Sequence, residues 1–383
     1  MDSENRYIGI INLQYTNNYG AVIAAAVLED IVQQIAGDGC VAETINYSPY
    51  KAMPNKLLQH MDNAKQWGGW RLYIKAILQR RRSGNSGKLR SQRFAAFKDK
   101  FLNLTPVVHD AYEIIGDKNY SAFITGSDIV WGPKRSDNFR ADGYYLKFAK
   151  EKGIKTIAYA PSLDNKVNRK LKKLSACYRE DLKNVDYISV REKDNIPFVQ
   201  SLTDKKVYEC CDPAFLVDSS YYDDMISTAE TEVDSDKYIY VYILEINQDI
   251  VDYANKLAQE KNLKICYYSS NHSNYIEHSQ DCITDGPAEF LYRLKNAEYV
   301  LTNSFHCVVF SLLFNKKFLS FTRSGVSIKT SNLLEKFDLT GRIITDKNKI
   351  DIDDEIDFEK TASVISQMKS ESMDYLRKSL AES

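Results

Sequence analysis

The residues best suited to chemistry lie between Asn296 and Phe314, in the sequence NAEYVLTNSFHCVVFSLLF. Residues Ala297–Leu301 predict a buried strand, and the apolar spacing after it predicts a buried helix. Between them stand Thr302, Asn303 and Ser304, three residue types that cap helix starts. His306 then lies one or two positions inside the helix. Helix starts attract anions, and histidine adds a proton that titrates near neutral pH, so an anion site with a proton donor is predicted. The alternative is a capped helix whose histidine only hydrogen-bonds a neighbour.

A second group of polar residues follows the predicted strands of the first half. Strand Tyr7–Leu13 leads through a Gly-containing loop into an apolar helix over 21–35, which places Asn18, Tyr19 and Gly20 at a helix start. The loop lacks the GxGxxG pattern, so no dinucleotide site is predicted. Ligands of open α/β sheets bind beyond the carboxyl ends of the strands, so the polar residues at these ends are expected to face one crevice. The alternative for each of them is an ordinary structural role in its own turn. These residues are Asn18, Ser127, Asp128, Ser162 and Arg191.

Composition restricts the class of protein. The chain has 383 residues, 44% of them hydrophobic, and a net charge of −1, so no basic field indicates nucleic acid. Its seven cysteines are scattered without a CxxC pair, which is typical of reduced thiols and a cytoplasmic location. The five histidines lack metal-ligand spacing, so no metal is expected. No apolar run is long enough to span a bilayer, and no signal peptide is recognised before Tyr7.

The order of predicted elements indicates an α/β protein with two domains. Strands and helices alternate through residues 1–220 and again through residues 237–360, and the polar, acidic segment 221–237 between them is predicted to be a linker. A final amphipathic helix begins near Phe358 and is expected, over residues 361–383, to pack back on the N-terminal domain. The predicted strands are 7–13, 41–47, 122–128, 156–162, 186–191, 206–212, 238–244, 263–269, 297–301 and 318–321.

Taken in order, several stretches resemble the polysaccharide pyruvyl transferase family. They cover most of the chain and are IGIINLQYTNNYGAVIAAAVL, FITGSDIVW, TIAYAPS, DYISVRE, CDPAFLVD and GPAEFLYRLKNAEYVLTNSFHCVVFSLLFNKKF. The resemblance implies two Rossmann-like domains resembling a GT-B glycosyltransferase, with a cleft between the lobes. It also implies transfer of pyruvate from phosphoenolpyruvate to two hydroxyls of a sugar as a ketal. Phosphoenolpyruvate is then a substrate, and no cofactor is expected.

The implied chemistry assigns roles to residues of this chain. A proton donor must reach the methylene carbon of phosphoenolpyruvate, and His306 is the best candidate. Arg191 matches an arginine that the family places after its fourth N-terminal strand, and its planar fork suits an anion. Ser304 and Asn303 are expected to help hold the donor. Several family members carry arginine where this chain has Ser304, so Arg323 or Lys329 is expected to replace that charge.

Other interpretations remain open. A GT-B-like glycosyltransferase would use a nucleotide sugar on the same fold, and a non-catalytic scaffold of a polysaccharide assembly complex would release no phosphate. The acceptor could be lipid-linked through a polyprenyl diphosphate, nucleotide-linked or polymeric. Residues 63–98 contain ten Lys and Arg and no acidic residue, with Trp67 and Trp70 near a predicted amphipathic helix. That pattern favours a peripheral contact with the inner face of a bacterial cell membrane, and an ordinary surface helix is the alternative.

Overall fold

The computed structural model describes residues 6–48, 84–132, 141–163, 174–231, 237–245, 247–269, 276–321, 328–345 and 350–381. The chain divides into two compact units. Unit 1 consists of residues 1–84, 98–216 and 371–383, and unit 2 of residues 85–97 and 217–370. Two helices, α4 (Gly84–Phe101) and α14 (Phe358–Ala381), contribute residues to both units.

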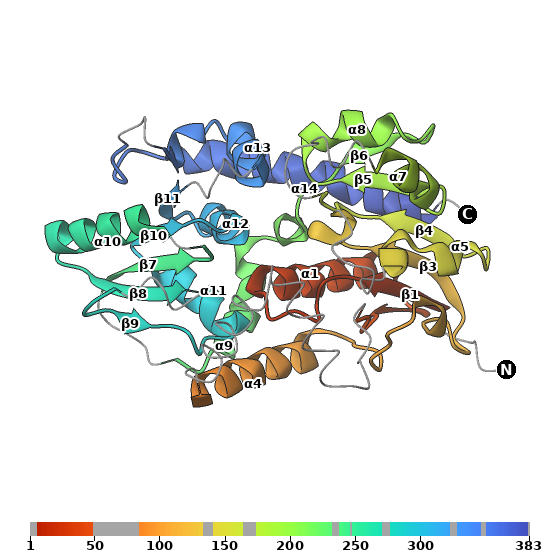
Figure 1. Ribbon diagram of the computed structural model, residues 1–383, viewed down its shortest axis with the longest axis horizontal. Helices are drawn as coiled ribbons and strands as arrows, with labels where there is room; N and C mark the ends of the chain where they lie inside the picture. Colours follow the sequence, from red (N-terminus) through yellow and green to blue (C-terminus); the bar gives the residue numbers. More distant parts are fainter. Residues whose placement is uncertain are drawn as a thin grey trace. The chain divides into compact units, whose positions relative to one another are not determined.

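Unit 1 is built on a six-stranded parallel sheet in the order β2-β1-β3-β4-β5-β6 (Figure 1). Its strands are short, and their inner residues are buried because helices cover parallel sheets on both faces. The strands are β1 (Arg6–Ile11), β2 (Cys40–Thr44), β3 (Tyr120–Thr125), β4 (Lys155–Ala158), β5 (Tyr187–Val190) and β6 (Val207–Glu209).

Helices and 3₁₀ turns connect these strands. The longest complete helix of unit 1, α1 (Tyr19–Ala36), starts at Asn18, whose side chain accepts a hydrogen bond from the Ala21 amide. The others are α5 (Lys147–Lys150), α7 (Ser175–Leu182), α8 (Ile196–Gln200), η1 (Ala111–Glu113), η2 (Ile129–Trp131), η3 (Ala141–Tyr145), η4 (Lys193–Asn195) and η5 (Pro213–Leu216).

The two faces of the unit 1 sheet carry different cores. Phe123 on β3 meets Phe148 of α5 edge to face, with ring centroids 4.9 Å apart. On the other face, a Cβ added to Gly126 would lie 3.2 Å from Leu28 of α1 and 1.6 Å from Asn12 Oδ1. Position 126 therefore requires glycine, because α1 and the Asn12 amide occupy the space of a side chain.

Among the helices that the structure describes, α1 alone is long and apolar enough to cross a membrane. Most of this helix is buried inside the protein, including Val22, Ile23 and Val27, which have no exposed surface. A buried core helix passes the same length and composition test as a membrane span, so the burial explains the apolar sequence of α1.

Unit 2 contains a second six-stranded parallel sheet, in the order β12-β11-β10-β7-β8-β9. The strands are β7 (Tyr238–Ile243), β8 (Lys264–Ser269), β9 (Gln280–Asp281), β10 (Tyr299–Thr302), β11 (Lys317–Phe321) and β12 (Ile343–Ile344). The helices are α9 (Tyr222–Ser227), α10 (Gln248–Lys261), α11 (Pro287–Asn296), α12 (Phe305–Leu313) and α13 (Ile328–Lys336), with 3₁₀ turns η6 (Ser219–Tyr221) and η7 (Thr340–Arg342).

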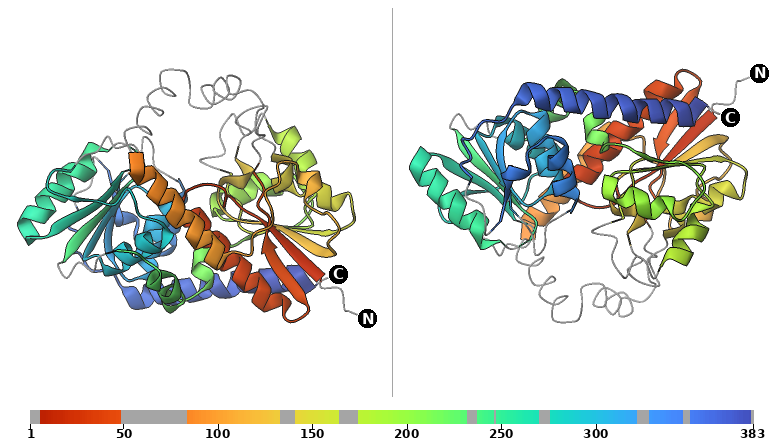
Figure 2. Two further views of the ribbon diagram at one scale, coloured as in Figure 1. Left: turned by 90° about the horizontal axis from the view of Figure 1, so that it is seen from below. Right: turned by 90° about the horizontal axis from the view of Figure 1, so that it is seen from above.

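The alternation of side chains along β7 assigns these helices to opposite faces of the sheet. Ile239, Val241 and Ile243 share a core with the apolar face of α10. Tyr242 instead packs edge to face on Phe290 of α11, with ring centroids 5.4 Å apart. Figure 2 shows α10 and α11 on the two sides of this sheet. All six residues of β7 are buried, as the inner strand of a covered sheet requires.

The last turns of α14 pack on unit 1. Ser372 Oγ accepts a hydrogen bond from the Cys211 amide at 2.9 Å, and the Tyr375 hydroxyl donates one to the Ala158 carbonyl at 2.8 Å. Lys155 Nζ donates to the Leu380 carbonyl at 2.8 Å. These contacts join the end of α14 to β4 and to the residues that follow β6, the edge strand of the sheet.

The structure differs from the predicted elements in two places. The segment 221–237, predicted to be a linker, contains helix α9, because Tyr222 and Met225 are buried and Tyr222 packs on Phe310 of α12. Asp223 and Asp224 made this segment look polar and acidic, so its apolar face was not recognised in the sequence. The boundary between the units also falls at residue 216/217 rather than 220.

The basic stretch 63–98 is only partly described. Trp67, Trp70 and the predicted amphipathic helix around them lie outside the described residues. Within α4, Arg90 lies over the rings of Phe94 and Tyr268, at 4.9 and 5.3 Å from their centroids. Arg90 is therefore engaged by the protein itself, and the membrane contact stays a prediction.

Candidate active site

The turn between β10 and α12 brings the predicted chemical residues together in unit 2. Thr302 Oγ1 donates a hydrogen bond to the Tyr242 carbonyl at 2.9 Å and accepts one from the Ser304 amide at 3.0 Å. Ser304 is the N-cap of α12, in extended conformation, and within the described residues its hydroxyl makes no capping bond. Thr302 therefore stabilises the turn, and Ser304 lies at the N-terminus of α12.

Asn303 ties this turn to the neighbouring strand. Its Oδ1 accepts a hydrogen bond from the Leu244 amide at 2.8 Å, and its Nδ2 donates one to the Glu245 carbonyl at 3.0 Å. Both bonds go to the connection between β7 and α10. Asn303 therefore positions two adjacent strand ends, and its polar atoms are engaged there rather than presented to a ligand.

His306 is the second residue of α12, as predicted, and its side chain is buried, with 7% of its surface exposed. Its ring stands nearly perpendicular to that of Phe305, with centroids 5.3 Å apart. The first turn of α12 contains no acidic residue. Amide N–H groups and the positive end of the helix dipole favour an anion here, and the imidazole lies beside it.

Lys329 and Arg323 are the two cations expected near this turn. Lys329 lies in the first turn of α13, which packs on α12, and is nearly buried at 9% exposure. Arg323 lies outside the described residues. Lys329 is thus the candidate whose helix the structure places beside the His306 helix.

Arg191, at the end of β5 in unit 1, occupies a buried network of carboxylates. Its Nη1 lies 2.7 Å from Asp212 Oδ2, and its Nε lies 2.9 Å from Glu192 Oε1. Nη1 also donates to Ser127 Oγ at 3.4 Å, and Nη2 lies 3.9 Å from Asp128 Oδ1. Burial lowers the pKa of Arg191, but the Glu192 and Asp212 carboxylates outweigh it and raise this pKa above its usual value.

This geometry favours a structural role for Arg191. The Arg191 side chain has 4% of its surface exposed, and its guanidinium already has two carboxylate partners at hydrogen-bond distance. A donor anion would have to compete with them. The sequence alone did not single out Asp212, although an acid directly before Pro213 at a strand end was visible. The assignment of Arg191 as a donor ligand stays a prediction.

The polar residues of the unit 1 strand ends form one group, as expected for a parallel sheet. Ser127 and Asp128 follow β3 and contact Arg191. The Ser162 amide, after β4, donates to the Asp128 carbonyl at 2.8 Å, and the Ser162 side chain is fully buried. Asp128 adopts a φ of +73°, a strained value for a residue with a side chain.

The start of α1 carries the other predicted site residues of unit 1. Tyr19 is buried and Asn18 caps the helix. Hydrogen bonds and an ion pair join Ser127, Asp128, Ser162 and Arg191 into one group, whereas a role for Asn18, Tyr19 and Gly20 in the same group stays a prediction.

A model of the polysaccharide pyruvyl transferase family matches residues 18–325. The chain belongs to the polysaccharide pyruvyl transferase family. The matched region includes the β10–α12 turn, His306 and the Arg191 network. No curated protein matches the chain.

Solved structures similar to this pyruvyl transferase family member include UDP-N-acetylglucosamine 2-epimerases. The Rickettsia bellii enzyme has 9% identity and a TM-score of 0.50, with 97% of each chain covered. The Neisseria meningitidis enzyme bound to UDP-GlcNAc has 8% identity and a TM-score of 0.49, covering 97% of this chain and 93% of that one. The Methanocaldococcus jannaschii enzyme with UDP-GlcNAc and UDP has 10% identity and a TM-score of 0.49, covering 95% and 92%. At these identities only the fold is shared, and the predicted α/β fold with two Rossmann-like, GT-B-like lobes is confirmed.

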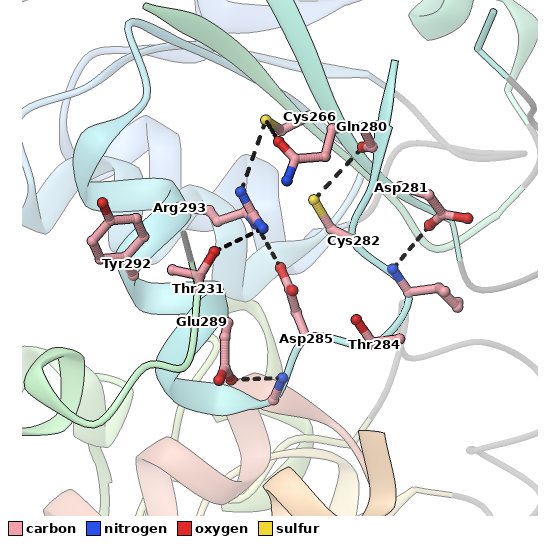
Figure 3. A network of polar contacts seen from close by, with 12 residues as sticks. Thr231, Cys266, Gln280, Asp281, Cys282, Thr284, Asp285, Glu289, Tyr292 and Arg293 are labelled. Atoms are coloured by element: carbon pink, nitrogen blue, oxygen red, sulfur yellow. Dashed lines mark hydrogen bonds and ion pairs between the residues drawn. The ribbon is translucent and has the colours of Figure 1, made fainter. Parts of the chain in front are cut away.

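Unit 2 of the chain also contains a buried ionic network that the sequence pattern did not reveal (Figure 3). On α11, Arg293 Nε lies 2.8 Å from Asp285 Oδ2, and Arg293 Nη2 donates to Thr231 Oγ1 at 2.9 Å. Glu289 Oε2 accepts from the Gly286 amide at 2.9 Å and so caps the same helix. Glu289 and Arg293 are spaced i, i+4 in GPAEFLYR, and the capping box in this motif was the signal that could have located the network.

Arg93 of α4 joins this network from a distant part of the sequence. Its Nε lies 3.3 Å from Glu289 Oε1 and its Nη1 lies 3.9 Å from Asp285 Oδ1. Its guanidinium also donates to the Thr284 carbonyl at 3.2 Å and to the Glu230 carbonyl at 2.6 Å. Two cations thus face two buried carboxylates, which fixes residues 85–97 to unit 2.

Replacing Arg293 with methionine is expected to destabilise unit 2 by ~3–5 kcal/mol, because it leaves the buried Asp285 carboxylate without its closest cation. Burial raises the pKa of Asp285 to about 6, against the opposing effects of Arg293 and Arg93. Because the pKa of Asp285 is higher in the folded state than in the unfolded state, the folded state loses stability as the pH rises through the interval between these two values. The loss in Arg293→Met should therefore be larger at pH 8 than at pH 5, as measured by urea unfolding.

Lys295→Met on the same helix is the matched control for this prediction. Lys295 pairs with the exposed Asp223 carboxylate, and such surface pairs contribute ~0–1 kcal/mol. Equal losses in the two variants, or a loss in Arg293→Met that does not change with pH, would contradict a buried charge network.

Proposed function

We propose that this protein transfers pyruvate from phosphoenolpyruvate to two hydroxyls of a sugar, as a ketal, in surface polysaccharide biosynthesis. The observation that carries the proposal is His306 at the start of α12, within the region that matches the family. An anion-attracting helix start and a titratable proton side by side are what phosphoenolpyruvate requires. Lys329 on the adjacent α13 supplies a cation for the donor.

The proposed reaction proceeds in two additions. A proton from His306 goes to the methylene carbon of phosphoenolpyruvate, and the adjacent carbon becomes electrophilic. One sugar hydroxyl attacks this carbon, and its proton restores the proton that His306 gave up. The carbon–oxygen bond to phosphate then breaks, with the bonding electrons leaving on phosphate. The second hydroxyl attacks the same carbon and closes the ring, and its proton passes to the released phosphate. The products are the ketal and inorganic phosphate, so atoms and charge balance without a redox partner.

The proposal requires no cofactor, because phosphoenolpyruvate itself carries the activated carbon. The described residues include no cluster of His, Cys, Asp or Glu that could hold a metal ion. A cytoplasmic location is part of the proposal and is supported by seven cysteines that are all free thiols.

The test is phosphate release from phosphoenolpyruvate with a panel of acceptor sugars, and mass spectrometry of the products. With a correct acceptor, one phosphate should appear for each pyruvyl group added, and chelator-treated protein should behave identically. Nucleotide sugars without phosphoenolpyruvate form the comparison arm. Sugar transfer from a nucleotide sugar, without use of phosphoenolpyruvate, would overturn the proposal in favour of a glycosyltransferase.

A further inference from the structure

Lys98, near the end of α4, is a partly buried cation in unit 1 that the proposed reaction does not use. Its Nζ donates a hydrogen bond at 3.5 Å to the Thr16 carbonyl, in the loop between β1 and α1. Apart from Thr16, the described residues offer it no hydrogen-bond or ion-pair partner. A lysine withdrawn from water without a counter-ion is costly, and an anionic ligand would offset that cost.

The position of Lys98 is fixed by the end of its helix. The Leu102 amide donates to the Lys98 carbonyl at 3.0 Å, and the next residue, Asn103, donates its amide to Glu29 Oε1 of α1 at 2.7 Å. Phe97, beside Lys98, is buried at 3% exposure. The lysine is thus held against the β1–α1 loop by contacts on both sides of it in the sequence.

The loop that Lys98 contacts is itself ordered and polar. The Thr16 amide and hydroxyl both donate to the Leu13 carbonyl, at 3.1 and 2.8 Å. Two amide side chains of the loop are almost fully buried, Asn12 at 4% and Gln14 at 1% exposure. Asn12 Nδ2 and Gln14 Oε1 have no hydrogen-bond partner among the described residues. Gln14 Nε2 donates to the Ile45 carbonyl at 2.8 Å, so the amide is held in place while its oxygen stays unsatisfied. Buried polar atoms without partners are rare, and a bound water or ligand group would complete this loop.

We propose that Lys98 and the loop 12–18 bind a phosphate group on the acceptor sugar, the group through which the sugar is linked to its carrier. The inference rests on the proposed function, in which the donor anion is bound at His306 in unit 2. A single ammonium suits phosphate as a point charge, whereas carboxylates are more often met by the fork of an arginine. The neutral amides of Asn12 and Gln14 suit sugar hydroxyls.

Lys98 should make phosphate binding sensitive to pH. Burial lowers the pKa of Lys98 to about 8, and no carboxylate among the described residues opposes this. Its neighbours on α4, Asp99 and Lys100, are exposed, and Tyr15 is the only titratable side chain within the loop. Because only the charged lysine attracts phosphate, affinity should fall as pH rises through about 8.

The first test measures binding without turnover. Calorimetric titration of the full-length protein with inorganic pyrophosphate should show at least about tenfold weaker binding in Lys98→Met, and near wild-type binding in Lys98→Arg. Raising the pH from 7 to 9 should weaken binding more in the wild type than in Lys98→Arg, which stays charged. Lys88→Met, which removes an exposed lysine of the same helix, is the matched control and should bind as the wild type does.

The second test uses steady-state kinetics with three acceptors carrying the same sugar: a nucleotide diphosphate, a polyprenyl diphosphate and a neutral oligosaccharide. Lys98→Met should raise KM for the phosphate-linked acceptors, leave KM for phosphoenolpyruvate unchanged, and not affect the neutral acceptor. The carrier that shows the larger KM effect identifies the source of the phosphate. Unchanged pyrophosphate binding in Lys98→Met, or a higher KM for phosphoenolpyruvate alone, would overturn the proposal. Because pyrophosphate binding needs no transfer, failure of the proposed reaction would be seen separately.

Discussion

Replacing His306 with alanine is expected to lower the rate of pyruvyl transfer by ~10²–10⁴-fold, the usual contribution of a general acid. Phosphoenolpyruvate becomes electrophilic only when its methylene carbon is protonated, and His306 is the titratable side chain at the start of α12. His306→Gln keeps much of the shape and removes the imidazole that would donate the proton, so it should lose a similar factor. The measurement is phosphate release under saturating phosphoenolpyruvate and acceptor.

A stability control separates catalysis from folding in this experiment. His306 is buried, so both variants need thermal unfolding curves that match the wild type before a lower rate is attributed to chemistry. His278→Asn serves as the matched variant, because His278 is exposed in the same unit and adopts a φ of +57° that asparagine tolerates. Near wild-type turnover in His306→Gln would assign His306 a packing role and the acid to another residue.

Replacing Arg191 with methionine is expected to lower the free energy of unfolding by ~3–5 kcal/mol, because Glu192 and Asp212 would remain buried without their cation. Urea unfolding at neutral pH measures this. The matched control is Arg377→Met in the same unit, since Arg377 pairs with Asp374 on the surface at 61% side-chain exposure. That variant should change stability by less than about 1 kcal/mol.

Kinetics of Arg191→Lys decide between the structural role and the donor clamp inferred from the family resemblance. Lysine keeps the charge for Asp212 but cannot reproduce two parallel hydrogen bonds to an anion. If Arg191 only holds the strand ends, the folded variant should keep the KM of the wild type for phosphoenolpyruvate. A selectively higher KM for phosphoenolpyruvate would show that the guanidinium reaches the donor when it binds.

The periodicity of apolar residues was sufficient to predict the alternating strands and helices. The predicted helix 287–296 matches α11, and the predicted strand 238–244 matches β7 to within one residue. Strand β7 is fully buried, and α11 buries one face, so the local sequence pattern and the tertiary environment agree. The α/β class, the two Rossmann-like lobes and the family were therefore accessible from the sequence.

The ionic networks were not accessible in the same way, because they join residues that are far apart in the chain. Arg93 and Asp285 are 192 positions apart and meet only after α4 and α11 have packed. Arg191 and Asp212 follow different strands, and only the parallel sheet brings them to one edge. The pattern around Arg191 could indicate an anion-binding side chain, but it could not show that Asp212 already supplies the anion.

The path of the chain through unit 1 has a consequence for biosynthesis. Unit 1 begins with β1 yet includes residues 371–383, and Ser372 and Tyr375 bond to the Cys211 amide and the Ala158 carbonyl. A ribosome that has made only the first 216 residues has therefore not yet produced all the partners of that sheet. Native unit 1 can be completed only when the last helix leaves the exit tunnel, so the first unit to be translated is not the first to be finished. For the same reason, no single cut in the gene separates the two units intact.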